Sequence, residues 1–365
     1  MAQAVLFAIS VTVVSSTAEL ALTRAKGLAI GVAYGLSWGL QRAVDADFHE
    51  IAFAVPLMAV VMRQLYLRRW NRAAWWSLPL LLVKEDMGLT VAAVGVLLLF
   101  NRRWQSGALL VSGGVAAVSL TVYRIIPWFA VDHHYAYFSN LPGGSATHAH
   151  IGSMLLGLIW PAVKWRTLGW IFGLTGLLCL RSPLVLMAVP TLAWRFSSDN
   201  TAYWGTAWHY NAVLMPVVFL AAVDAVVRMD KARWEWARSY ARQAAPLMVG
   251  VAVAISVGMS LTLSELADPA TYPSGPQVAA LRAADRLIPD GASVETGNPQ
   301  LAALASRCTV FWPGGDPVGP QYITLDLSWW SPGMTPVAYA EMAHRGTVYQ
   351  QIFNEQQVVV LRRVS

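Results

Sequence analysis

The chain has 365 residues, of which 56% are hydrophobic and 13% are charged, and its formal net charge is +6. The apolar residues form long runs instead of the short periodic patches of a soluble core, which indicates a polytopic α-helical membrane protein. The lysines and arginines lie in short segments between these runs, where they set orientation, so the charge excludes a nucleic-acid partner and makes the lipid bilayer the expected one. Cys179 lies in an apolar run and Cys308 in a polar region, which predicts neither a disulfide nor a metal site.

Apolar runs predict about ten membrane crossings, judged against the roughly 20 residues that a helix needs to span a bilayer. We expect them at residues 4–23, 27–44, 51–67, 73–100, 107–129, 168–180, 184–194, 211–227 and 246–263. The run 73–100 is too long for one span, so we interpret it as a hairpin of two crossings. A shorter apolar piece at residues 151–163 predicts an interfacial or re-entrant helix. The basic segments place the acidic and histidine clusters on the outer side of the membrane.

Two further patterns concern the N-terminal region. Residues 1–23 carry no positive charge before Arg24, which is the reverse of a signal peptide. With Arg24 and Lys26 in the cytoplasm the chain would begin outside, so we expect that an earlier span precedes it. The second apolar run has a glycine at every fourth position, which predicts a helix face packed closely against a neighbour. These glycines are Gly27, Gly31, Gly35 and Gly39.

After Glu265 the character of the sequence changes, which predicts a transmembrane domain over residues 1–266 and a second domain over residues 267–365. Residues 276–287 have an amphipathic helical pattern, and short strand patterns follow, ending in QQVVVLRRV. This alternation predicts a small α/β domain outside the cytoplasm. It has no glycine-rich phosphate loop, so we expect no nucleotide site there.

The segment DADFHE, residues 45–50, concentrates three carboxylates and one imidazole beside two apolar runs, and such groups are costly near a membrane. Asp47, His49 and Glu50 are therefore candidates for acid/base catalysis. Asp45, Asp47 and Glu50 are candidate ligands if a metal is used, and their oxygen atoms would favour magnesium or manganese. The alternative is a solvated helix start, with Asp45 or Asp47 as the N-cap.

A second candidate cluster is the sequence KED at the tip of the predicted hairpin. Lys84 is a candidate for binding a phosphate as a point charge, with Glu85 and Asp86 as orienting groups. Its flanks LLLV and MGLTV contain almost no polar spacer, so the charges lie near membrane depth, where unpaired charges are costly. The alternative is a self-neutralising turn.

The third candidate cluster follows the run 184–194. Arg195, His209 and Tyr210 are candidates for binding an anion or stacking on a sugar ring. The alternative is an interfacial aromatic belt, including Trp194 and Trp204, with a snorkelling arginine. Four histidines between residues 131 and 150 have no zinc-site spacing, and we interpret them as solvated loop residues. These are His133, His134, His148 and His150.

Three segments carry a family resemblance: VDADFHEIAFAVPL, LPLLLVKEDMGLTVAAVGVLLL and LRSPLVLMAVPTLAWRFSSDNTAYWGTAWHYNAVLMPV. In order and spacing they resemble the bacterial predicted membrane proteins known as domain of unknown function 2079. That family is similar in layout to the C-class (GT-C) glycosyltransferases, which use a polyprenyl-phosphate sugar donor outside the cytoplasmic membrane. Family members begin with a further span and an aspartate-bearing outer loop, so the resemblance implies that this chain is truncated before them.

The resemblance implies a membrane glycosyltransferase of the cell envelope, in which a carboxylate deprotonates the acceptor while Lys84 and His209 hold the lipid phosphate. Two other classes remain open. A lipid or small-solute transporter or flippase would need internal repeats, and none is convincing. A non-catalytic membrane scaffold would bind no donor.

Overall fold

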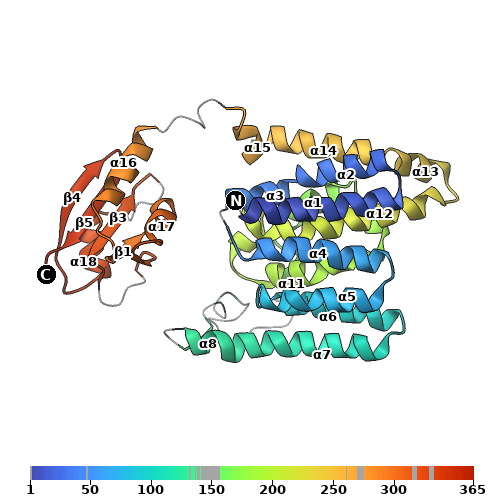
Figure 1. Cartoon of the computed structure of the whole chain (residues 1–365), viewed down its shortest axis with the longest axis horizontal. Coiled ribbons are helices and arrows are strands. Elements are labelled where there is room, and N and C mark those ends of the chain that lie inside the picture. The colour runs from blue at the N-terminus through green and yellow to red at the C-terminus, as the bar shows by residue number, and fades with distance from the viewer. Residues whose placement is uncertain are drawn as a thin grey trace. The chain divides into compact units, whose positions relative to one another are not determined.

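A computed structural model describes residues 2–46, 48–130, 133–135, 137, 140, 157–259, 261–268, 275–314, 319–328 and 333–365. The chain divides into two compact units, Met1–Ala267 and Asp268–Ser365. The first is helical, and the second contains a small sheet covered by helices (Figure 1). Asp47, His148, His150 and residues 151–156 of the predicted interfacial helix lie outside the described residues.

Most helices of the first unit follow the apolar runs of the sequence. In its N-terminal half they are α1 (Ala2–Ala21), α2 (Arg24–Gly35), α3 (Trp38–Asp45), α4 (Ile51–Tyr66), α5 (Trp70–Ser77), η1 (Leu78–Leu82), α6 (Met87–Phe100), α7 (Trp104–Leu120), η2 (Thr121–Ile125) and α8 (Ile126–Phe129). In its C-terminal half they are α10 (Val163–Gly173), η4 (Leu178–Arg181), η5 (Pro183–Ala188), α11 (Val189–Ser197), η6 (Thr201–Tyr203), η7 (His209–Leu214), α12 (Met215–Asp230), α13 (Glu235–Arg242), α14 (Ala244–Gly258) and α15 (Thr262–Glu265).

Fewer of these helices are long than the sequence predicted. Within the described residues, three helices are long and apolar enough to cross a membrane: Ala2–Ala21, Trp104–Phe129 and His209–Asp230. A fourth is added if α13 and α14, which meet at a 55° bend, are taken together. Shorter apolar helices lie at Ile51–Tyr66, Met87–Phe100 and Pro183–Ser197.

The prediction of one helix over residues 27–44 is wrong, because the chain breaks between α2 and α3. Ser37 has an extended backbone with ψ of 135°. The Gln41 side chain donates to the Leu36 carbonyl at 2.8 Å, so one carbonyl freed by the break is satisfied. The glycine stripe therefore lies on two helices. A Cβ on Gly31 would press on Ser15 of α1, whereas a Cβ on Gly39 would press on Met215.

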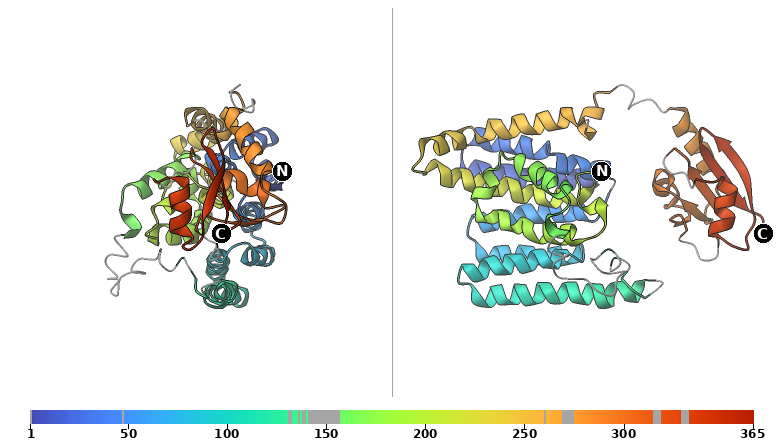
Figure 2. Two further views of the ribbon diagram at one scale, coloured as in Figure 1. Left: turned by 90° about the vertical axis from the view of Figure 1, so that its left-hand side faces the viewer. Right: turned by 180° about the vertical axis from the view of Figure 1, so that it is seen from behind.

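Helix α12 forms the centre of the first unit, among α1, α4 and η4 (Figures 1 and 2). Every residue from Met215 to Val226 is buried, including the single acid Asp224. That carboxylate accepts hydrogen bonds from Ser182 at 2.5 Å and from Arg228 at 2.7 Å. A helix that is apolar all round is stable only inside a protein or a membrane, which explains its central place.

Helices α6 and α7 pack together at one edge of the first unit (Figures 1 and 2). Glycines of the two helices face each other at this contact. A Cβ on Gly88 would lie 2.6 Å from the Gly114 carbonyl oxygen, and one on Gly95 would lie 2.7 Å from the Gly107 carbonyl oxygen. Small residues at a helix interface allow such close backbone approach. This contact fixes the position of α6 against α7.

Gly114→Ala is expected to lower stability by about 1–3 kcal/mol, because its methyl group would meet the backbone of α6. Gly113→Ala is the matched control, since a Cβ there meets nothing within 4 Å. Alanine also favours a helix over glycine, so the control should be neutral or slightly stabilising. Thermal unfolding in detergent measures both, and an equal effect of the two variants would contradict the close packing.

The second unit is a mixed α/β fold. Its strands are β1 (Ser293–Thr296), β2 (Thr309–Phe311), β3 (Tyr322–Asp326), β4 (Tyr349–Glu355) and β5 (Val358–Arg363), in the order β2-β1-β3-β5-β4. Strand β1 is parallel to β2 and β3, whereas β5 is antiparallel to β3 and β4. Its helices are α16 (Pro276–Arg286), α17 (Asn298–Leu304) and α18 (Pro336–Ala343). The predicted helix and small sheet are confirmed, while β4 and α18 were not predicted.

A buried carboxylate lies at the centre of this unit. Glu295 of β1 is fully buried and accepts hydrogen bonds from the Tyr339 hydroxyl at 2.7 Å and the Gly314 backbone N–H at 3.0 Å. The Nε2 atom of His344 lies 2.8 Å from Glu295 Oε2. Burial and the Glu295 carboxylate raise the pKa of Tyr339, so the hydroxyl remains a donor. The cluster joins β1 to α18 and its following loop.

Candidate functional site

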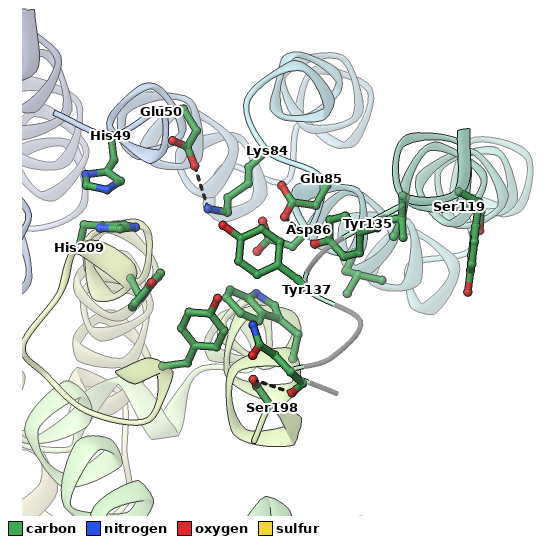
Figure 3. Close-up of a pocket in the computed structure, with 18 residues that line it drawn as sticks. His49, Glu50, Lys84, Glu85, Asp86, Ser119, Tyr135, Tyr137, Ser198 and His209 are labelled. Carbon is green, nitrogen blue, oxygen red and sulfur yellow. Dashed lines mark hydrogen bonds and ion pairs between the residues drawn. The ribbon is translucent and has the colours of Figure 1, made fainter. Parts of the chain in front are cut away.

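A cavity of about 530 Å³ lies in the first unit where several helix ends meet (Figure 3). It is bordered by the residues before α4, the turn before α6, the C-terminal part of α7 with η2, the end of α11 and the start of η7. Its lining comprises His49, Glu50, Lys84, Glu85, Asp86, Leu89, Val118, Ser119, Val122, Tyr123, Tyr135, Tyr137, Asn140, Trp194, Ser198, Tyr203, His209 and Tyr210. Residues of all three predicted clusters therefore meet in one place.

An ion pair links two of these clusters. Lys84 Nζ donates to Glu50 Oε1 at 2.8 Å, across 34 positions of sequence (Figure 3). Burial by itself would raise the pKa of Glu50, but the hydrogen bond and charge of Lys84 lower it overall. Burial would lower the pKa of Lys84, but the same bond and the nearby carboxylates raise it overall. Both groups are therefore charged at neutral pH. The ion-pair partner of Lys84 is Glu50, which lies outside the turn of residues 84–86, so the alternative of a self-neutralising turn does not account for Lys84.

Asp86 has the most perturbed carboxyl group of the described cavity. Burial raises its pKa to about 6, with a lowering effect from Lys84 and a further raising effect from Glu85. Its Oδ1 atom is buried and makes no hydrogen bond among the described residues. The Trp194 indole lies close enough to lower the pKa slightly, but its geometry falls short of a hydrogen bond. The helix α6 begins at the next residue, and Asp86 makes no side-chain cap.

The free energy of unfolding of the wild-type protein, compared with that of Asp86→Asn, is expected to fall as the pH rises from about 4 to about 6. A carboxyl whose pKa rises from 3.8 to about 6 on folding binds its proton more tightly in the folded state. The stabilisation is present at low pH and is lost as pH rises through the folded pKa, by about 3 kcal/mol. Unfolding midpoints at several pH values measure this difference. Asp45→Asn, at an exposed carboxylate outside the cavity, should follow the wild-type curve.

Glu85 is held by a residue that the sequence analysis missed. The Tyr135 hydroxyl donates to Glu85 Oε1 at 2.8 Å. Burial, followed by the charge of Glu85, raises the pKa of Tyr135 and keeps the hydroxyl protonated. Tyr135 and Tyr137 come from the region that we interpreted only as a solvated histidine loop. His133 and His134 of the same region are exposed and do not line the cavity.

Two histidines stack at the edge of the cavity (Figure 3). The rings of His49 and His209 lie 3.8 Å apart between centroids, at an angle of 24°. His209 is 4% exposed, and neither ring nitrogen has a hydrogen-bond partner among the described residues. Tyr210 packs edge-on against Trp194 and Tyr203. Trp194 is therefore part of the cavity wall, which contradicts its interpretation as an interfacial belt residue.

The remaining predicted residues lie elsewhere. Asp45 is the last residue of α3 and pairs with Arg42 at 2.9 Å, so it is not the N-cap of α4. Arg195 is fully buried, which contradicts a snorkelling role, and it does not line the cavity. Its guanidinium donates to Tyr203 O, Asn211 Oδ1 and Gly205 O. Arg195 thus holds together the loop that leads into η7.

The described residues do not form a metal centre. Among them, no three side chains of His, Cys, Asp or Glu are placed to hold one ion. The predicted set of Asp45, Asp47 and Glu50 includes one residue that lies outside the described part. Of the other two, Asp45 forms an ion pair with Arg42, and Glu50 forms one with Lys84.

A family described as predicted membrane protein (DUF2079) matches residues 1–333. The chain belongs to this family. No curated protein and no solved structure matches it. The DUF2079 match includes every residue that lines the cavity, and the family predicted from the sequence is confirmed. As a DUF2079 member, the chain is a membrane protein whose apolar helices contact the bilayer.

Proposed function

We propose that this protein is an integral membrane glycosyltransferase that takes its sugar from a polyprenyl-phosphate donor. The observation that carries the proposal is the cavity itself, which combines carboxylates, one ammonium group and aromatic rings with apolar residues. Carboxylates and aromatic faces suit a sugar, and an ammonium suits a phosphate. The resemblance in layout to C-class glycosyltransferases that we inferred from the sequence favours the same class, as a fold-level analogy.

Asp86 is the carboxylate best suited to act as general base. Glu50 and Glu85 already accept hydrogen bonds from Lys84 and Tyr135, and pairing with Lys84 makes Glu50 less basic. Asp86 has a pKa of about 6, near neutral pH, where a general base is most effective. In the transfer, the acceptor oxygen bonds to the sugar C1 as its proton passes to Asp86. The bond from C1 to the phosphate oxygen breaks, and the lipid phosphate leaves.

Lys84 is the group that we assign to the leaving phosphate. An ammonium has three N–H donors, and one of them is used by Glu50. The others are available to phosphate oxygens, on which negative charge develops as the sugar leaves. His209 borders the same cavity, and its ring nitrogens have no hydrogen-bond partner in the part of the chain that the structure describes, so it is placed to add a hydrogen bond. We assign no step to a metal ion.

The apolar wall of the cavity suits a lipid-linked donor. Leu89, Val118 and Val122 come from α6 and from the helix Trp104–Phe129. Only 11% of the most apolar 18-residue stretch of that helix is buried inside the protein, so most of this stretch is available to lipid. A polyprenyl chain that runs along this helix would bring its phosphate to the charged part of the cavity.

We further propose the topology that this activity needs. The shorter apolar helices and the broken runs would cross the membrane together with the long ones, giving about ten crossings of the cell membrane. The cavity and the second unit would then lie on its outer face. Broken helices are tolerated at membrane depth where neighbouring protein satisfies their backbone groups, as Gln41 does for Leu36.

The test uses the full chain in lipid nanodiscs with a panel of polyprenyl-phosphate hexoses and pentoses that carry a radioactive sugar. Cell-envelope glycans serve as acceptors, and transferred label is counted after the donor lipid is extracted. Label in the glycan fraction supports the proposal. Movement of intact donor between leaflets of proteoliposomes, without transfer, would instead identify a flippase. Absence of donor binding would favour the scaffold.

A further inference from the structure

A second, much smaller cavity adjoins the main one on the side of α11 and η7. Its volume is about 10 Å³, which is close to the space that one water molecule requires. It is lined by Ile51, Lys84, Asp86, Met87, Thr191, Trp194, His209, Tyr210 and Val213. An apolar pocket of this size would be dry, so its polar atoms decide what it holds.

Three of the lining residues carry polar atoms that are buried and lack hydrogen bonds among the described residues. They are Asp86 Oδ1, Trp194 Nε1 and the two ring nitrogens of His209. Such buried groups are rare in proteins, because each unmade hydrogen bond costs about 1–3 kcal/mol. Because these three residues line one small cavity, a single small molecule inside it can form hydrogen bonds with all of them. Asp86, Trp194 and His209 come from three separate elements, so the convergence is not an effect of local sequence.

The donor and acceptor types of these atoms match those of water. Trp194 Nε1 can only donate, an ionised Asp86 oxygen can only accept, and a neutral imidazole has one accepting nitrogen. One water molecule accepts from the indole and donates one proton to each of the other two groups. These three hydrogen bonds are the usual number for a buried water.

We propose that one water molecule is a fixed part of this site, bridging Trp194 Nε1, Asp86 Oδ1 and one ring nitrogen of His209. This hydration site is independent of the proposed transferase activity, because it rests on the buried atoms alone. It has a consequence for ligand recognition. A His209 nitrogen that accepts from water leaves the N–H on the other nitrogen, so His209 acts as a hydrogen-bond donor toward a ligand in the main cavity.

Infrared difference spectroscopy of the full chain in nanodiscs tests the proposal. The carboxyl band of protonated Asp86 is identified because it is absent in Asp86→Asn. As Asp86 is protonated, a water O–H band should change with it, and this band should shift in H₂¹⁸O. Val213→Ile places an extra methylene beside the small cavity and should remove this band and raise the Asp86 midpoint by about one pH unit. Val217→Ile, which is equally buried in α12 directly after η7 and lies outside the cavity lining, should leave both unchanged.

A second variant keeps the test decisive if Val213→Ile does not fold. Trp194→Phe removes the indole donor and should weaken or abolish the isotope-sensitive band. The proposal is overturned if no band responds to ¹⁸O, since Trp194 and Asp86 would then interact without water. A cationic His209 at neutral pH, read from the ¹⁵N shifts of its ring nitrogens, would also overturn it, because imidazolium cannot accept a hydrogen bond.

Discussion

Asp86→Asn is expected to lower the proposed sugar transfer by about 10²–10⁴-fold, the usual contribution of a general base. The amide is close in shape to the carboxyl, so the cavity should remain intact and donor affinity should change little. The wild-type rate should rise with pH through a midpoint of about 6, because the base acts only when it is deprotonated. Initial rates between pH 5 and pH 8, together with separate donor-binding measurements, test both statements.

The matched control for this prediction is Asp45→Asn. Asp45 belongs to the other acidic cluster of the sequence, DADFHE, and it pairs with Arg42 outside the cavity. Its replacement should leave the rate within about twofold. Transfer that survives in Asp86→Asn with an unchanged pH profile would exclude Asp86 as the base, and Glu50 or a residue outside the described part would take its place.

His344→Leu is expected to destabilise the second unit by about 3–5 kcal/mol, since it leaves the carboxylate of Glu295 buried without one of its partners. Both side chains are almost fully buried, at 1% and 0% exposure, so water cannot replace the lost contact. Hydrogen exchange of the full chain, read at β1 and β3, should show a matching loss of protection. The helices of the first unit should keep their protection.

Two further variants separate this buried pair from surface charge. Asp290→Asn removes the surface ion pair between Asp290 and Arg307. The Asp290 side chain is 80% exposed, so the loss should cost no more than about 1 kcal/mol of stability. The double variant Glu295→Gln with His344→Leu should be more stable than His344→Leu alone, because no charge remains buried. If the double variant were no more stable, the cost would come from lost packing instead of from the buried charge.

The candidate site could be predicted from the sequence only in its charged parts. DADFHE and KED stand out because charges are rare in this chain, and His49, Glu50 and Lys84 do line the cavity. The pairing of Lys84 with Glu50 could not be predicted, since it joins segments that are 34 residues apart. Tyr135 lacks any local signal, because a tyrosine in a loop has the same pattern whether it faces water or a carboxylate.

Arg195 shows the opposite error. A cationic residue at the end of an apolar run is typical of a snorkelling side chain, and nothing local indicates that three acceptors will surround it. Those acceptors, from Tyr203, Gly205 and Asn211, are positioned only when the following loop folds back. Trp194 was misread for the same reason, since its neighbours Tyr203 and Tyr210 approach it through that loop.

The sequence alone determined the membrane class and the position of the second unit's central strands, because these depend on composition, on long apolar runs and on local alternation. The family followed from the resemblance of three segments in their order and spacing. It failed at β4, an edge strand whose mostly exposed residues carry no apolar alternation, and at the break between α2 and α3. Only the tertiary structure decided which charges are paired, which carboxyl is buried and which polar atoms converge. Those properties depend on distances between segments remote in the chain, and a pKa or a cavity exists only after those segments have packed.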